Sequence, residues 1–376
     1  MKNAADYQHM AALQQPHALL VVTDTTPGIE FGIDAHSWEL GPKFEGLHSL
    51  PAGLHLLTFA PGNIAGREGV WIHCAGGVHR QTWDARNECL GAAPALADVQ
   101  LRSLAAAARC GALTLAPYPP GHAQIWAAVA RHVDEPTLRR CNLRLDAVFG
   151  PGGIDGDAPV ANEPRWTPVG PAAMRQRRAG DATAFFGPDA TLRLKATAAP
   201  DVLLKELALA FVIFLALGSL SALTQWQYLV RLFCACDALM AEDAALFDAL
   251  ASLLTAQLAL APEDFFRDAL GKDEDVLRAA LLEFFANASD KPRLANAANG
   301  LLAFAQRRFG LWADHASAAA LVAARVHETG DNIAQEVDIM RHVRPGEDPT
   351  MCATRLIEAG GEGYGEAVAY LEALGV

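Results

Sequence analysis

The sequence lacks the short motifs that mark well-known catalytic sites. It contains no G-x-S-x-G turn, no H-E-x-x-H zinc motif and no pair of carboxylates flanked by the polar residues that a substrate site needs. The glycine-rich stretch at residues 150–153 lacks the G-x-x-x-x-G-K-[ST] pattern and its flanking strand and helix, so it predicts no phosphate-binding loop. These absences argue against several enzyme classes, and an enzyme with an unrecognised site remains one alternative.

Basic residues are also scarce. The chain has 30 Lys and Arg against 43 Asp and Glu, a formal net charge of −13. Binding to a phosphate backbone requires a basic surface, so we expect no direct nucleic-acid binding. The compact basic cluster of Arg175, Arg177 and Arg178 is interpreted as a solvated loop. Residues 331–376 hold nine acidic residues and three arginines, which predicts an acidic tail.

Cysteine and histidine spacings fit neither a disulfide scaffold nor a metal site. Seven cysteines are an odd number in a chain of 376 residues, and buried thiols are expected. Cys234 and Cys236 have no second pair downstream, which favours a helical face over zinc. Five histidines gather in the first part of the chain, at positions 36, 48, 55, 73 and 79, without the spacing of a ligand set. No metal or cofactor is expected.

The longest apolar block, Lys205–Cys236, is the main structural signal. Residues 207–230 carry no charge, which is long enough for a membrane-spanning helix. Gly218 and Ser219 interrupt the block with a helix stop and an N-cap, so a buried helical hairpin is favoured over a membrane span. In the second half we expect a buried stripe, with Gln225 lying off it; the stripe is formed by Leu220, Leu223, Trp226, Val230 and Phe233. The first twenty residues hold no apolar run of signal length, which predicts an intracellular protein.

Residues 19–84 have the short apolar runs and turn residues of β-structure. Leu19–Thr23 and Leu54–Phe59 are predicted strands. Val70–Cys74 and Val78–Trp83 are predicted to pair as a hairpin through Gly76 and Gly77, because glycine tolerates the positive φ of a two-residue turn. Two helices are expected, one from about Ala93 to a glycine stop at Gly111 and one that starts near Pro120.

The second half of the chain reads as successive amphipathic helices. Asp243 lies where a helix begins, Asp264 and Asp273 lie near two further starts, and Gly271 is a predicted stop. Glu206 is interpreted as a charge near a helix N-terminus rather than as a general base. The fold class is therefore α+β and multidomain, a β-sandwich-like N-terminal domain followed by an all-α helical domain. The predicted boundaries are a β-rich domain at 1–148, a linker at 149–200, a helical domain at 201–312 and an acidic tail at 313–376.

Several stretches together resemble the Aar-two splicing-factor family. They run from about Leu19 to Trp312 and include Phe31-Gly32-Ile33-Asp34, Ser37-Trp38-Glu39, Gly41-Pro42-Lys43-Phe44-Glu45-Gly46, Leu50-Pro51-Ala52-Gly53-Leu54-His55, Pro117-Tyr118-Pro119 with Trp126, Glu206 to Trp226 with Cys234, and Pro262-Glu263-Asp264-Phe265-Phe266.

This resemblance implies a non-enzymatic assembly factor of the U-five small nuclear ribonucleoprotein. Such a factor binds the Prp-eight scaffold protein of the spliceosome, and the scaffold is contacted at its own RNase-H-like and Jab/MPN domains. While bound, the factor keeps the spliceosomal helicase from docking early in pre-mRNA splicing. The implied protein is a monomer when free, does not bind membranes, and is found in the cytoplasm and nucleus. A helical adaptor unconnected with splicing is the other alternative.

The resemblance also suggests partner-binding residues. Trp38 and Phe44 lie in the matched motifs, although a packed core is the commoner fate of such aromatics. Residues 318–326 fall where the family has an apolar tail segment that can add a strand to a sheet of the partner, with Leu321, Val322 and Ala323 as contacts. Five of these nine residues are alanine, so a helix is expected in the free protein.

Overall fold

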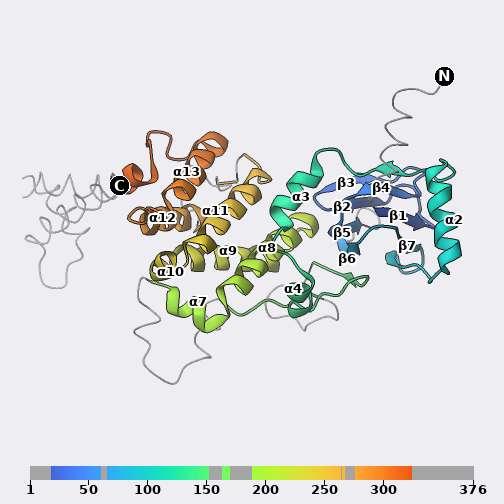
Figure 1. Cartoon of the computed structure of the whole chain (residues 1–376), viewed down its shortest axis with the longest axis horizontal. Helices are drawn as coiled ribbons and strands as arrows, with labels where there is room; N and C mark the ends of the chain where they lie inside the picture. Colours follow the sequence, from blue (N-terminus) through green and yellow to red (C-terminus); the bar gives the residue numbers. More distant parts are fainter. Residues whose placement is uncertain are drawn as a thin grey trace, which may run out of the picture. The chain divides into compact units, whose positions relative to one another are not determined.

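The computed structural model describes residues 18–60, 66–151, 163–169, 189–263, 265–266 and 276–323 (Figure 1). The chain divides into two compact units, the first ending at Leu281 and the second beginning at Leu282. The α+β class expected from the sequence is confirmed, with two β-sheets followed by helices. The predicted starts and stop at Asp264, Gly271 and Asp273, the basic cluster at 175–178 and residues 324–376 lie outside the described residues.

Two five-stranded sheets form the N-terminal part of the first unit. One sheet has the order β8-β7-β1-β4-β9 and the other has the order β10-β6-β5-β2-β3. The strands are β1 (Ala18–Thr23), β2 (Glu30–Ile33), β3 (His36–Glu39), β4 (Gly46–Leu50), β5 (Gly53–Ala60), β6 (Glu68–Cys74), β7 (Val78–Asp84), β8 (Cys89–Ala92), β9 (Ala116–Pro117) and β10 (Val148–Phe149). Apolar side chains of both sheets form one common buried core, among them Leu20, Leu47, Phe31, Phe59 and Ile72. The strands expected at 19–23 and 54–59 are confirmed.

The predicted hairpin between β6 and β7 is wrong. β6 pairs with β5 and β10, whereas β7 pairs with β1 and β8, in the other sheet. Gly76 and Gly77 do adopt positive φ, 97° and 74°, but the turn carries the chain from one sheet to the other. A glycine turn fixes a local change of direction, while the strand that each edge meets depends on segments far away in the sequence.

Three helices follow strand β8, of which the first packs on β7 and the other two contact the later helices of the first unit. They are α2 (Asp98–Arg109), α3 (His122–Ala130) and α4 (Glu135–Arg140). α2 ends before Gly111, whose φ is 73°, as the sequence predicted. α3 packs against α8 (Pro200–Leu217) and α11 (Ala244–Ala259), and α4 also packs against α8. The two-sheet region and the helices α8 and α11 therefore belong to the same compact unit.

The apolar block folds as the predicted broken hairpin. α8 ends at Gly218, with φ 71°, and α9 (Leu220–Cys234) begins after Ser219, whose hydroxyl accepts the backbone N–H of Ala222 at 3.2 Å. The two helices then pack against each other. Within the described ranges, no helix is both long and apolar enough to cross a membrane.

The buried face of α9 differs in part from the prediction. Trp226, Val230 and Phe233 are fully buried, but Leu220 in the first turn is 61% exposed. Gln225, which was predicted to lie off the stripe, is buried. Its burial reflects a polar partner on α8, Glu206, which the apolar pattern could not indicate.

The remaining helices agree with the prediction only in part, because the helix at residues 191–197 lies in the segment 149–200 that was predicted to be a linker, and the helix at residues 237–242 was not predicted. They are α7 (Thr191–Thr197), α10 (Asp237–Glu242), α11, α12 (Val276–Ala288) and α13 (Ala295–Phe309). Asp243 caps α11 by accepting the backbone N–H of Leu246 at 3.1 Å, and Gly310 ends α13 with φ 70°. In the second unit, residues 318–323 are helical.

Candidate partner-binding site

A groove opens between the edges of the two sheets. β3 is the last strand of one sheet and β9 is the last strand of the other. The groove has a volume of about 420 Å³ and is lined by residues of β3, of β9 and of the segment that leads into α3: His36, Trp38, Ala116, Pro117, Pro119, Pro120 and His122. The seven lining side chains include neither a carboxylate nor a Lys or Arg.

Aromatic packing fixes the β3 wall of the groove. Phe31 and Trp38 face each other across the β2–β3 pair, and their rings meet edge to face at 5.5 Å. Phe44 packs on both, with ring centroids 5.3 Å from Phe31 and 6.1 Å from Trp38. Both Trp38 and Phe44 are half-buried against the core, so their positions are set by packing.

Two histidines face each other across the groove. The ring centroids of His36 on β3 and His122 at the start of α3 lie 4.6 Å apart. Partial burial lowers the pKa of His36, and the neighbouring His122 lowers it further. The neutral imidazole of His36 is therefore favoured at neutral pH, and the β3 wall is uncharged. Among the described residues no group of three or more His, Cys, Asp and Glu side chains is arranged to hold a metal ion.

A buried carboxylate holds both walls of this groove. Asp34, in the β2–β3 turn with φ 60°, is 3% exposed. Its Oδ2 accepts the hydroxyl of Tyr118 at 2.5 Å and Nδ1–H of His55 at 2.8 Å, and its Oδ1 accepts the backbone N–H of Leu56 at 3.0 Å. Tyr118 lies between two prolines of the groove wall. The turn that begins β3 and the segment that follows β9 are thus joined at one residue.

His55 is held as a double donor. Its Nε2 lies 2.8 Å from the carbonyl of Pro51, and its Nδ1 faces Asp34, so both ring nitrogens meet acceptors. Burial by itself would lower the pKa of His55, but the hydrogen bond and charge of Asp34 and the Pro51 carbonyl raise it above its ordinary value. The imidazolium form fits this site, since only that form donates from both nitrogens.

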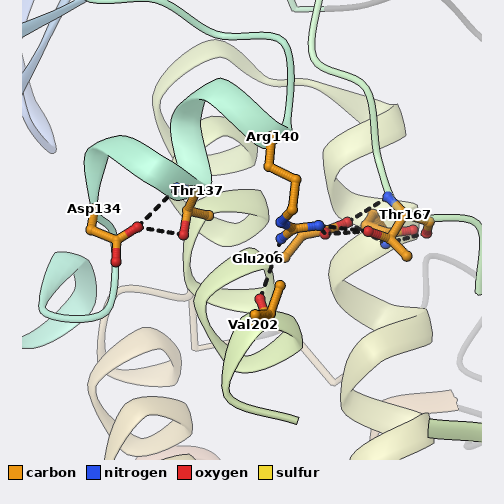
Figure 2. Close-up of polar contacts among 7 residues, drawn as sticks. Asp134, Thr137, Arg140, Thr167, Val202 and Glu206 are labelled. Carbon is orange, nitrogen blue, oxygen red and sulfur yellow. Dashed lines mark hydrogen bonds and ion pairs between the residues drawn. The ribbon is translucent and has the colours of Figure 1, made fainter. Parts of the chain in front are cut away.

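A second polar cluster lies on the helical side of the first unit (Figure 2). Glu206 on α8 is fully buried, and Arg140 at the end of α4 forms an ion pair with it. Glu206 Oε1 accepts Nε2–H of Gln225 at 2.8 Å and the backbone N–H of Thr167 at 2.7 Å, and Oε2 accepts the Thr167 hydroxyl at 2.7 Å. The prediction that Glu206 is a charge near a helix end is wrong, because α8 begins at Pro200.

This cluster fastens the segment 163–169 to the helices. Gln225 also donates to the carbonyl of Thr167 at 2.9 Å, and Arg140 donates to the Thr167 hydroxyl at 2.7 Å. Two residues before Thr167, the backbone N–H of Arg165 donates to the carbonyl of Cys141 at 3.0 Å. Figure 2 shows Arg140 and Thr167 converging on Glu206 from different segments. The carboxylate thus stabilises the packing of three segments distant in sequence.

The predicted contact residues fall in different environments. Trp38 lines the groove, whereas Phe44 packs behind it and is not a lining residue. Leu321 is buried in the second unit, Val322 is half-buried and Ala323 is exposed. The helix at 318–323 agrees with the conformation expected for the free protein. Their role in binding a partner stays a prediction.

Sequence reasoning missed the residues that shape the groove. His36 was considered only as a possible metal ligand, and His122 was not singled out. Asp34, His55 and Tyr118 each lie in a different stretch of the family resemblance, which was the available signal. Their convergence at one buried site indicates that these stretches carry the architecture of the N-terminal part.

The fold defines an α+β protein in which a two-sheet domain is followed by packed helices. Two family models match it: the AAR2 N-terminal domain over residues 16–143 and the AAR2 C-terminal repeat region over residues 161–314. The chain belongs to the AAR2 family.

Curated relatives agree with this assignment. Protein AAR2 homolog of Mus musculus is 26% identical over 319 residues, covering 72% of this chain and 83% of the relative, and the Homo sapiens homolog gives the same values. Protein AAR2 homolog of Caenorhabditis elegans is 25% identical over 305 residues, covering 69% of this chain and 84% of the relative.

Proposed function

We propose that this protein is a non-enzymatic assembly factor of the U-five small nuclear ribonucleoprotein. Membership of the AAR2 family supports a splicing-related role. The observation that carries the proposal is the match of both family models, N-terminal and C-terminal, in order on one chain. The proposed partner is the Prp-eight scaffold protein, bound through its RNase-H-like and Jab/MPN domains.

The proposed mechanism is steric and competitive. While the protein occupies the scaffold, the spliceosomal helicase cannot dock on the same surface, and release of the protein permits docking. A folded body of fixed shape suits such a mechanism, and the Glu206 cluster and the Asp34 cluster each join distant segments of the first unit.

The burial of the acid–base residues supports the non-enzymatic part of the proposal. Asp34 and His55 are an Asp–His pair of a type that enzymes use, but they are 3% and 1% exposed and their hydrogen bonds are made within the protein. A general base must be within reach of a substrate proton. This pair is better suited to holding the fold.

Calorimetry with purified components tests the proposal. The full chain is titrated into fragments of its own scaffold protein that contain the RNase-H-like domain, the Jab/MPN domain or both. We expect binding to the RNase-H-like domain and tighter binding to the two-domain fragment. No heat change at concentrations up to about tens of micromolar would reject the proposal and favour a helical adaptor unconnected with splicing. Competition with the helicase on the same fragment tests the blocking step.

The proposal also includes location and oligomeric state. The factor would be a monomer when free and would occur in both the cytoplasm and the nucleus. Light scattering of the purified protein and fractionation of the source cell test these two points.

A further inference from the structure

We propose that the groove between β3 and β9 docks an extended peptide of a partner, which pairs with the outer edge of β3 and places one uncharged apolar side chain beside Trp38. This inference goes beyond the proposed function, because it concerns one surface of the N-terminal part and holds whichever protein supplies the peptide.

The edge of β3 offers unused backbone groups. Leu40 donates its N–H to the carbonyl of Ile29 at 2.8 Å, toward β2. Backbone groups in an antiparallel pair alternate in direction, so His36 and Trp38 also face β2, while Ser37 and Glu39 direct their N–H and C=O groups outward. Within the described sheet β3 has no neighbour on that side. An extended chain is the ligand that such an edge accepts.

The facing edge cannot close the gap by itself. β9 has only two residues, Ala116 and Pro117, and it pairs with β4. Pro117, Pro119 and Pro120 have no backbone N–H, and the N–H of Tyr118 donates to the carbonyl of His48 at 2.9 Å, so these positions cannot donate to a strand opposite β3. The groove between β3 and β9 therefore stays open, and a peptide that binds there would take its register from β3.

The chemistry of the lining selects an uncharged side chain. His36 and Trp38 lie on the same face of β3, toward the groove, and the partly buried Trp38 and Ala116 pack on the apolar core. A charged anchor would lose its hydration there without an opposite charge among the lining side chains, which is costly. The volume of about 420 Å³ admits a large apolar side chain. The absence of charged groups among these lining side chains thus favours a peptide with a neutral anchor.

The test uses the full chain and a defined set of labelled peptides. Each peptide has about nine residues of alternating Ser and Thr, with a central Leu, Trp, Glu or Lys. Fluorescence anisotropy measures binding, and amide hydrogen exchange follows Ser37 and Glu39. We expect the Leu and Trp peptides to bind at least about tenfold more tightly than the Glu and Lys peptides. Exchange at the Ser37 and Glu39 amides should slow when the Leu or Trp peptide is bound.

Two substitutions at one position separate strand pairing from side-chain contact. Ser37→Pro removes the outward N–H but leaves the groups that face β2, and edge strands tolerate proline in this orientation. Ser37→Ala keeps the N–H and removes only the hydroxyl, which donates to Glu30 at 2.9 Å. We expect Ser37→Pro to weaken binding by about tenfold and Ser37→Ala to change it by less than about twofold.

A second pair of variants tests the groove itself. Trp38→Ala should weaken binding of the Leu peptide by about tenfold, whereas Val99→Ser, on α2 and 67% exposed, should have no effect. Circular dichroism confirms that each variant is folded before binding is measured. The proposal is overturned if no peptide binds up to about 1 mM. Equal binding by the Ser37→Pro and Ser37→Ala proteins, both folded, would also overturn it.

Discussion

The hydroxyl of Tyr118 donates to Asp34 Oδ2 at 2.5 Å, across 84 residues of sequence. Asp34 follows strand β2 of one sheet, and Tyr118 follows the edge strand β9 of the other. Burial, the charge of Asp34 and the hydrogen bond itself raise the pKa of Tyr118, which favours the protonated phenol as the donor. This contact couples the two sheets at the base of the groove.

Tyr118→Phe should therefore destabilise the protein. The substitution keeps the ring and removes a donor to a buried carboxylate, and hydrogen bonds to charged groups contribute about 1.5–3 kcal/mol. Urea unfolding measures the change. Tyr228→Phe, on α9 and half-buried, is the matched control and should change the free energy of unfolding by less than about 0.5 kcal/mol. Equal effects of the two substitutions would mean that the Tyr118 hydroxyl does not stabilise the fold.

His55 should give the protein a pH dependence in the neutral to alkaline range. The pKa of His55 is raised in the folded state, so its stabilisation is fully present below the ordinary value of 6.5 and is lost as pH rises through the folded pKa. We expect the free energy of unfolding to fall as pH increases above 6.5. His55→Gln should flatten this part of the curve. His73→Gln, at an exposed position of β6, should leave it unchanged; a curve unaltered by His55→Gln would contradict the assignment.

Phe211 and Phe214 provide a comparison within one helix. Phe211 is 2% exposed and packs against Trp226 with ring centroids 5.3 Å apart, whereas Phe214 is half-buried. Phe211→Ala should cost about 3–5 kcal/mol, because it leaves a cavity in the core. Phe214→Ala should cost clearly less. Thermal or urea unfolding of both variants checks the order, and a reversed order would show that the packing of α8 is misassigned.

Glu206 should be more important for stability than any exposed carboxylate of the described helices. Removing one partner of a buried ion pair costs about 3–5 kcal/mol, so Glu206→Ala should be strongly destabilising. Glu242→Ala breaks an ion pair with Lys195 in which both side chains are at least 40% exposed, and should cost at most about 1 kcal/mol. Amide exchange at Thr167 is a specific readout, since its N–H donates to Glu206. Unchanged exchange in a folded Glu206→Ala protein would contradict the proposed role.

The tail can be tested by a truncation placed with the structure in mind. Deletion from Ala313 would remove Ala318, which donates its backbone N–H to Asn299 at 3.0 Å, and the buried Leu321. Deletion from Ala324 spares these contacts. We expect the protein truncated from Ala324 to keep its unfolding transition. We also expect it to bind the two-domain scaffold fragment more weakly than the full-length protein does, with the loss on the Jab/MPN side. Equal affinities of this truncated protein and the full-length protein would exclude a binding role for the residues from Ala324 onward.

The sequence by itself determined the local features of the helices. The break at Gly218 and Ser219, the cap at Asp243 and the stop at Gly111 depend on the conformational preferences of single residues and on hydrogen bonds over three or four positions. Each of these signals lies within a few consecutive residues, so these helix boundaries could be predicted from the sequence. The family resemblance located the motifs, but it did not say which of their side chains meet.

Only the tertiary structure decided the pairings between distant segments. Val70–Cys74 and Val78–Trp83 were predicted to pair with each other and lie in different sheets, and Leu220 fits the apolar period yet remains exposed. Glu206 and Gln225 are buried because each satisfies the other, a compensation that hydrophobic periodicity does not register. The physical reason is common to these cases: the free energy of a strand edge or a buried polar group depends on its partner, and that partner is chosen by the whole fold.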